Sequence, residues 1–297
     1  MKPFTAALLF YIALSLAGLH ARDSAETVTV SGISYHPPEA MVADPDQRCL
    51  LDIVHPATRP GFATLVWFHG GGLTGGRKGM PTFDGQGVAL VAAGYRLSPQ
   101  AKCPEFIEDA AAAVAWTIKT IAHYGGDTKK VFIGGHSAGG YLAAMVGMDP
   151  RWLQPHGLTP QSIAGLIPVS AQATTHFHVK ELRGIPGPSL RPVIDEFAPL
   201  HHVSKNLPPI CLILGDRRIE FKCRVEENEL LFATLRNLEH PEVEFHELKD
   251  FDHNTVTQGA ARLMPLFIER ISQSIEPASQ PTQDADPPPD RLPLRVR

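Results

Sequence analysis

The sequence predicts an α/β fold built on a mostly parallel sheet of eight strands, with helices on both faces. Short apolar runs recur along the chain and alternate with longer segments of helical periodicity, which is the pattern of parallel strands joined by crossover helices. The chain has 297 residues, 43% of them hydrophobic, so it is long enough to bury one large core. We therefore expect one folded domain over residues 28–275, with no internal repeat.

The strands are expected where short apolar runs stand between turn residues. Residues 28–35 alternate in polarity, as a strand with one exposed face would, whereas residues 63–68, ATLVWF, are apolar throughout and indicate a fully buried strand. The same criteria apply to the remaining runs. The eight expected strands are residues 28–35, 48–54, 63–68, 87–95, 131–133, 163–169, 210–214 and 243–248.

The helices are expected from apolar residues that recur every three or four positions. In residues 104–124 such a stripe runs along one face, and Gly125-Gly126 follows it as a stop signal. A second helix should begin directly after Ser137, where Ala, Leu and Met dominate. Two more are expected over residues 224–238 and 255–275.

Residues 171–206 show no clear period and contain several prolines, so we expect an irregular insertion over the sheet that forms a lid or a wall of the substrate site. Its histidines could bind a metal, but no carboxylate or cysteine shares their spacing, and polarity of the pocket is the preferred interpretation. No metal site is therefore predicted. The histidines are His176, His178, His201 and His202.

The two ends of the chain differ from the domain between them. Met1-Lys2 is followed by an uncharged apolar stretch to Leu19 and then by polar residues, which resembles a secretory signal peptide over residues 1–21. We expect cleavage after Ala21 and export of the protein to the periplasm or the exterior, with no integral membrane segment after processing; an uncleaved anchor is the alternative. Residues 277–297, rich in Pro, Gln, Asp and Arg, are expected to be a disordered tail.

Composition narrows the range of partners. The formal net charge is −4 and no basic block is present, so neither nucleic acid nor an anionic membrane surface is an expected partner. Four cysteines could form disulfides in an oxidising compartment, but Cys211 lies within an apolar run, and buried free thiols are the simpler interpretation. No C-x-x-C spacing supports a zinc site, and nothing in the composition indicates the oligomeric state.

The strongest functional signal is Gly135-His136-Ser137-Ala138-Gly139, a G-x-S-x-G sequence between a buried strand and a helix. A serine on so sharp a strand-to-helix turn has its hydroxyl held above the sheet, and the flanking positions must be glycine because a Cβ would collide with neighbouring strands. The start of the following helix places partial positive charge where an oxyanion would form. Ser137 is therefore the candidate nucleophile.

Two other sites could complete a hydrolase. His69-Gly70-Gly71-Gly72 directly follows a strand, and the backbone N–H groups of Gly71 and Gly72 could join that of Ala138 around one oxygen. His253, between the last strand and the last helix, is the candidate base.

The acid should follow the seventh strand, in Gly215-Asp216-Arg217-Arg218-Ile219-Glu220. We expect Asp216, whose short side chain leaves a strand end at the catalytic edge of the sheet. Glu220 is the alternative, provided that residues 217–219 form one tight turn.

The motifs HGGG, YRLSP, GHSAGG, a GD-containing loop and a late DH resemble the α/β-hydrolase superfamily, over about residues 35–275. More narrowly they are similar to its carboxylesterase branch, which includes hormone-sensitive-lipase-like esterases, feruloyl-esterase-like proteins and arylformamidases. His136 stands where lipase-like members usually have Asp, which favours the feruloyl-esterase and formamidase side. Arg218 stands where the common G-x-x-D spacing would place the acid.

The resemblance implies a serine hydrolase that cleaves small esters through an acyl-enzyme, without a cofactor. An arylformamidase-type amide hydrolase is one alternative, and a non-catalytic α/β-hydrolase that binds a ligand is another. The mixed polarity of the proline-broken lid favours a small neutral or aromatic substrate over a long-chain lipid. Arg96 and Asp109 are expected to form either a structural ion pair or a solvated one.

Overall fold

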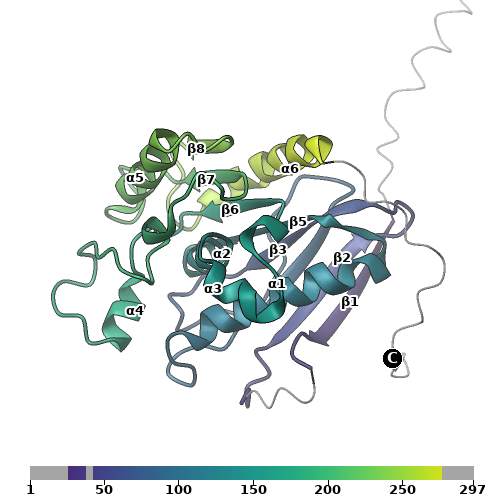
Figure 1. The fold of residues 1–297 in the computed structure, drawn as a ribbon, viewed down its shortest axis with the longest axis horizontal. Helices are drawn as coiled ribbons and strands as arrows, with labels where there is room; N and C mark the ends of the chain where they lie inside the picture. The colour runs from purple at the N-terminus through teal and green to yellow at the C-terminus, as the bar shows by residue number, and fades with distance from the viewer. Residues whose placement is uncertain (1–25, 38–42, 276–297) are drawn as a thin grey trace, which may run out of the picture.

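The computed structural model describes residues 26–37 and 43–275 (Figure 1). The predicted signal peptide and the predicted tail, residues 1–21 and 277–297, lie outside the described residues. Within the part described, no helix combines the length and the apolar character that a membrane span requires.

An eight-stranded sheet forms the centre of the molecule, in the order β1-β2-β4-β3-β5-β6-β7-β8. The pairs β1–β2 and β2–β4 are antiparallel, and all pairs from β4 to β8 are parallel, which confirms the predicted mostly parallel sheet. The strands are β1 (Thr27–Ser34), β2 (Leu50–Pro56), β3 (Phe62–Phe68), β4 (Ala89–Ala93), β5 (Gly126–His136), β6 (Gly165–Val169), β7 (Ile210–Leu214) and β8 (Val243–Glu247).

Strand β5 is longer than the sequence indicates. It begins at Gly126, which pairs with Phe62 of β3, and it includes the polar segment 127–130 before the expected apolar core at 131–133. Those polar residues form an end of the strand where Thr128 and Lys130 are only partly buried and Lys129 is exposed, so they leave no apolar signal. The strand thus extends to His136, next to the candidate nucleophile.

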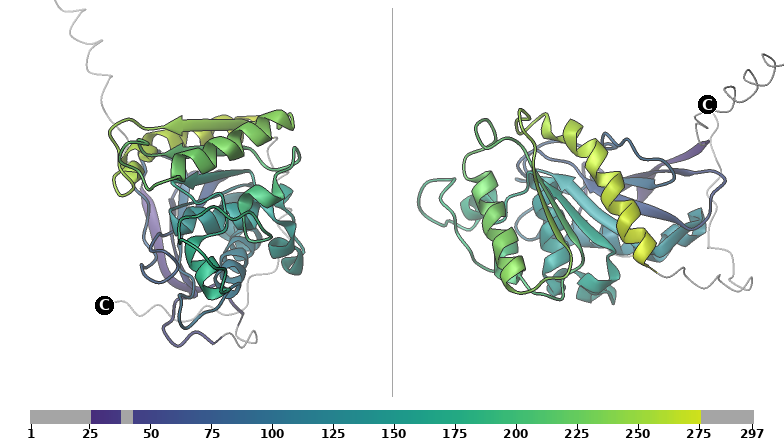
Figure 2. Two further views of the ribbon diagram at one scale, coloured as in Figure 1. Left: turned by 90° about the vertical axis from the view of Figure 1, so that its left-hand side faces the viewer. Right: turned by 90° about the horizontal axis from the view of Figure 1, so that it is seen from above.

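Helices cover both faces of the sheet, as predicted (Figure 2). Apolar residues of α1, α2 and α5 pack in one buried cluster, and those of α6 pack against the opposite face in a second cluster that includes Leu65 and Phe132. The α-helices are α1 (Glu105–Thr120), α2 (Ala138–Met148), α3 (Pro150–Leu153), α4 (Phe177–Leu182), α5 (Arg224–Asn237) and α6 (Val256–Ser274). Short 3₁₀ turns cover Ile121–Tyr124, Gln154–His156, Pro160–Ser162 and Pro199–His202.

The segment 171–206 is mostly irregular, as expected, but it contains the short helix α4 and one 3₁₀ turn, and it projects beside α2 and α5 (Figure 1). Residues 171–176 are all buried, whereas residues 181–195 are mostly exposed. The first part of this segment therefore belongs to the interior next to the end of β6.

Candidate active site

Ser137 lies on the sharp turn between β5 and α2, with φ 55° and ψ −116°. Its backbone N–H donates to the carbonyl of Val169, at the end of the neighbouring strand, at 2.9 Å. A Cβ on Gly135 would lie 2.4 Å from the carbonyl carbon of Gly139, and a Cβ on Gly139 would lie 2.1 Å from the carbonyl oxygen of Phe68. Only glycine fits at these two positions, which is the physical reason for the G-x-S-x-G pattern.

His253 connects the serine to a carboxylate. Its Nε2 lies 2.9 Å from Ser137 Oγ, and its Nδ1 lies 2.6 Å from Glu220 Oε1. Glu220 fixes the tautomer, because a proton held at Nδ1 leaves Nε2 free to accept the serine proton. The three side chains come from the ends of β5, β7 and β8, which meet at the carboxyl edge of the parallel sheet.

The structure corrects the expected acid, since Asp216 does not contact His253. Both oxygens of Asp216 accept from the guanidinium of Arg218, and Oδ2 also accepts from the backbone N–H of Asp250 at 2.9 Å. The turn between the two acids explains the difference. The N–H of Glu220 donates to the carbonyl of Asp216 at 2.8 Å, so one helical turn brings the longer side chain back to His253.

The carboxylate of Glu220 is fully enclosed and held by four donors. Oε2 accepts from Ser170 Oγ at 2.6 Å and from the Gly215 N–H at 3.1 Å, and Oε1 accepts from the Phe221 N–H at 2.8 Å besides His253. Burial raises the pKa of Glu220, but the hydrogen bonds from His253, Ser170 and Phe221 outweigh it and hold the pKa at about 2. Glu220 is therefore ionised throughout the pH range in which a histidine base works.

This environment predicts a pH dependence of stability. Folding lowers the pKa of Glu220 from 4.5 to about 2, so its contribution is complete above pH 4.5 and is lost as the pH falls towards 2. The difference in free energy of unfolding between the wild type and Glu220→Gln should therefore shrink over that interval. Urea unfolding of both proteins at a series of pH values measures it, and a difference that stays constant down to pH 2 would contradict the assignment.

The glycine loop after β3 approaches the serine closely. A Cβ built on Gly70 would lie 3.4 Å from Ser137 Cβ, so this loop and the turn at Ser137 are in contact. The backbone N–H groups of Gly71, Gly72 and Ala138 donate to no acceptor in the described part of the chain. Three free donors next to a serine hydroxyl match the requirements of an oxyanion hole.

Tyr95, from the YRLSP motif, holds the start of the glycine loop at His69. Its ring stacks on His69 with centroids 4.4 Å apart and an interplanar angle of 13°, and its hydroxyl donates to the His69 carbonyl at 2.7 Å. The N–H of Ser98 donates to the carbonyl of Leu73 at 2.9 Å. The YRLSP segment, which follows β4, thus holds the loop that presents the donors.

His136 supports the base. Its Nε2 donates to the backbone carbonyl of His253 at 2.7 Å, and the two rings lie 4.8 Å apart. Burial and the neighbouring His253 lower the pKa of His136 to about 4, so it is neutral and available as this donor. The opposite side of His253 is covered by the Phe221 ring, with centroids 4.6 Å apart.

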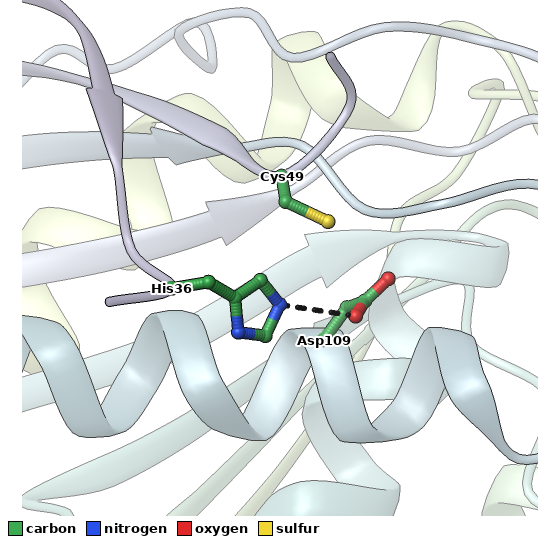
Figure 3. A group of neighbouring side chains, drawn as sticks. All are labelled: His36, Cys49 and Asp109. Carbon is green, nitrogen blue, oxygen red and sulfur yellow. Dashed lines mark hydrogen bonds and ion pairs between the residues drawn. The ribbon is translucent and has the colours of Figure 1, made fainter. Parts of the chain in front are cut away.

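Two groups of side chains among residues 26–37 and 43–275 have atoms close enough to share a metal ion. In the first, His36, Cys49 and Asp109 lie together near the N-terminal part of α1 (Figure 3). Both oxygens of Asp109 already accept from Arg96 at 2.8 Å, and burial raises the pKa of the Cys49 thiol to about 12. These residues do not fit a metal, and they establish the expected Arg96–Asp109 pair as a buried structural one.

The second group consists of Cys211, Glu244 and His246, and its side chains also have other partners or are protonated. The carboxylate of Glu244 pairs with Arg270 and with His246, and the thiol of Cys211 is buried with its pKa raised well above the ordinary value. The lid histidines belong to neither group. The four cysteines are free thiols; they are Cys49, Cys103, Cys211 and Cys223.

The sequence analysis did not identify four residues that lie near Ser137, His253 and Glu220. Ser170 follows β6 with φ 43° and binds Glu220, but no motif marks it. Phe177 covers Gly72, since a Cβ there would lie 3.3 Å from the ring. Phe221 packs on His253, and Arg224, at the start of α5, is 4% exposed although a charged first residue normally suggests a solvated helix end.

Comparison with known proteins agrees with this geometry. Residues 51–156 match the BD-FAE family model. The chain superposes on a truncated carbohydrate esterase from gut microbiota with a TM-score of 0.66, at 17% identity, over 85% of this chain and 99% of that one. It has the α/β-hydrolase fold. Esterase B from Lactobacillus rhamnosis is similar to this chain to the same degree, with a TM-score of 0.66 at 19% identity over 84% and 88% of the two chains.

Relatives by sequence are esterases too. Esterase LipC from Mycobacterium tuberculosis is 24% identical over 232 residues, which are 70% of this chain and 57% of LipC. Carboxylesterase NlhH from the same organism is 33% identical over 104 residues, 32% of each chain. The chain thus spans less than two thirds of the length of these curated relatives. Their names confirm the resemblance to the carboxylesterase branch.

Proposed function

We propose that this α/β-hydrolase is a serine carboxylesterase that cleaves small esters through an acyl-enzyme. The observation that carries the proposal is the continuous hydrogen-bonded relay from Ser137 through His253 to Glu220, beside three free backbone donors. The esterase relatives and structural neighbours support the same class of reaction.

The proposed reaction has two halves. Ser137 Oγ attacks the ester carbonyl while its proton passes to His253 Nε2, and the carbonyl oxygen becomes an oxyanion that the N–H groups of Gly71, Gly72 and Ala138 stabilise. The His253 imidazolium then protonates the leaving alkoxide, and the alcohol departs. A water molecule attacks the acyl-enzyme by the same route in reverse, which releases the acid and restores Ser137.

Glu220 stabilises the imidazolium without taking its proton. Its pKa of about 2 lies far below the range in which histidine titrates, so the proton stays on His253 Nδ1. No step of this reaction needs a cofactor.

An arylformamidase-type amide hydrolase is the second candidate, because His136 at the turn favours that side of the branch. A screen of short-chain 4-nitrophenyl esters, feruloylated and acetylated sugars, and N-formyl anilides separates the two. Faster turnover of the anilides would favour the amide hydrolase. Absence of both a burst and turnover with every activated ester would favour a protein that binds a ligand without catalysis.

Acyl-chain length gives a sharper test. The segment that adjoins the site contains a helix of only six residues, α4, and it offers no long amphipathic helix for a lipid surface. We expect kcat/KM for 4-nitrophenyl esters to be highest at two to four acyl carbons and to fall about tenfold or more by twelve, since without such a helix a long acyl chain stays in water, where it gains no burial and favours self-association of the ester. A rate optimum at long chains, with activation at an oil interface, would contradict this prediction.

A further inference from the structure

One face of α5 fixes the segment that follows β6. Asn228 Nδ2 donates to the carbonyl of Ala171 at 2.8 Å, and Glu227 Oε2 accepts from the backbone N–H groups of Ala173 and Thr174 at 3.1 and 3.2 Å. These bonds hold the chain directly after Val169, whose carbonyl binds the backbone of Ser137. The face of α5 therefore holds the segment that lies next to the turn at Ser137.

Arg224 lies one turn earlier on this face. Its guanidinium has five N–H donors but makes only one hydrogen bond within the described residues. Its Nη1 donates to the Ser170 carbonyl at 2.8 Å, yet no carboxylate of the described residues lies within 4.0 Å of the guanidinium. The residue is only 4% exposed. Its Nε and Nη2 have no hydrogen-bond acceptor in residues 26–37 and 43–275, and neither is completely enclosed there.

A structural role alone does not account for an arginine here. Asn228 makes the same kind of bond to the next carbonyl with a neutral amide, whereas burying a guanidinium carries a large desolvation cost unless an anion compensates it. Glu227 compensates only in part, because burial raises its pKa against the opposing effect of Arg224. Glu220 also attracts Arg224 from a distance, but no carboxylate of the described residues binds the guanidinium directly. A buried, charged, forked donor without a directly bound anion indicates a ligand.

His176 adds a neutral donor to the same place. Its Nδ1 accepts from the backbone N–H of His178 at 3.2 Å, so the proton of the neutral ring is on Nε2. The residue is 1% exposed, but Nε2, like the free nitrogens of Arg224, is unpaired and not enclosed within the described chain. Burial first, and then the charge of Arg224, hold the pKa of His176 well below its ordinary value, which keeps it neutral.

Both donors lie next to the reacting groups. The Arg224 guanidinium is 5.9 Å from the centre of the Phe221 ring, and that ring packs on His253. The His176 ring lies 4.3 Å from the ring of Phe177, which covers the oxyanion loop at Gly72. Each of the two donors is thus separated from the reacting groups by one aromatic ring, Phe221 for Arg224 and Phe177 for His176.

We infer that Arg224 and His176 form a carboxylate-binding subsite beside Ser137, and that the preferred substrates are small esters that also carry a free carboxylate. The inference rests on the proposed esterase function and departs from the expectation of a neutral substrate. The carboxylate belongs either to the acyl group, as in a half-ester of a dicarboxylic acid, or to the alcohol, as in an acylated hydroxy acid. Both present the same chemistry to the fork of Arg224.

Matched ester pairs test the inference. On the acyl side, 4-nitrophenyl hydrogen succinate is compared with its methyl-capped diester after subtraction of the spontaneous rate, and on the alcohol side 4-carboxyphenyl acetate is compared with 4-carbamoylphenyl acetate. We expect kcat/KM of the wild type to favour one anionic ester by about 10- to 100-fold, the range for one hydrogen bond to a charged group. Ratios near one for both pairs would overturn the subsite, although hydrolysis of the neutral esters would still support the esterase.

Variants on α5 identify the residue responsible. Arg224→Met should reduce the preferred ratio to near one, and Arg224→Lys should retain part of it, because a lysine keeps the charge and loses the fork. Arg236→Met, at an exposed position on the same helix, is the matched control and should keep the wild-type ratio. An unchanged ratio in Arg224→Met would assign Arg224 to structure alone.

A binding measurement covers the remaining outcomes. If Arg224→Met does not fold, or if no ester is hydrolysed, the thermal midpoint of Ser137→Ala is measured with succinate and with succinamide. The subsite predicts stabilisation by the dicarboxylate at concentrations at which the diamide has no effect, whereas equal effects would contradict it.

Discussion

Replacing Ser137 by alanine should lower kcat for an activated ester by about 10⁴- to 10⁶-fold, the range seen when the nucleophile of a serine hydrolase is removed. The loss follows from the geometry, because Ser137 Oγ lies 2.9 Å from His253 Nε2, and the glycine loop beside it has backbone donors without an acceptor in the described part of the chain. Steady-state hydrolysis of 4-nitrophenyl acetate, corrected for the spontaneous rate, measures the effect.

The fold should survive this change. The backbone angles at position 137 strain alanine and serine to the same extent, since both carry a Cβ. Within the described residues the hydroxyl bonds to His253 alone. The thermal midpoint should therefore stay within a few degrees of the wild type. Ser274→Ala, at the far end of α6, is the matched control and should keep wild-type turnover. Turnover near the wild-type rate in Ser137→Ala would remove Ser137 from the mechanism.

The sequence predicts the sheet well and marks the sharp turn at Ser137, because each leaves a local signature. A fully buried parallel strand such as β3 must be apolar at every position, and a turn in which a Cβ would lie 2.1 Å from a carbonyl oxygen must be glycine. Such constraints act on single positions or short runs. Such positions can therefore be recognised in the sequence without knowing which distant residues they contact.

The residues that were missed obey constraints from distant parts of the chain. Arg224 opens a helix and has the composition of a solvated end, yet its guanidinium lies against the carbonyl of Ser170, 54 positions earlier. Ser170 itself is defined by its bond to Glu220, 50 positions later. No period or motif records such pairs, because they depend on how the loops after β6 and β7 meet at the sheet edge.

The choice of acid depended on the same kind of information. Both Asp216 and Glu220 follow β7, and the sequence favours the shorter side chain at the strand end. What decides between them is the path of residues 216–220, where the N–H groups of Ile219 and Glu220 both donate to the Asp216 carbonyl, at 2.9 and 2.8 Å. This turn brings the Glu220 carboxylate to His253, while the Asp216 carboxylate accepts hydrogen bonds from Arg218.

Glu220→Gln should lower kcat by about 10⁴-fold, as expected when the carboxylate of a serine hydrolase triad is replaced by its amide. A glutamine can present its NH₂ group to His253 Nδ1 and so favour the tautomer with the proton on Nε2, which cannot accept from Ser137. It also removes the charge that stabilises the imidazolium. The expected change is in kcat rather than KM, since Glu220 is enclosed and does not face the substrate.

Asp216→Asn, measured side by side with Glu220→Gln, is the matched control, because it makes the same chemical change four residues earlier. Its carboxylate binds Arg218 and the N–H of Asp250, so its loss should weaken the loop before His253 and cost at most about tenfold in kcat, with a lower thermal midpoint. The reverse order, with Asp216→Asn inactive and Glu220→Gln close to the wild type, would show that the acid acts from position 216 in solution. Equal and small losses in both variants would mean that His253 works without a carboxylate partner.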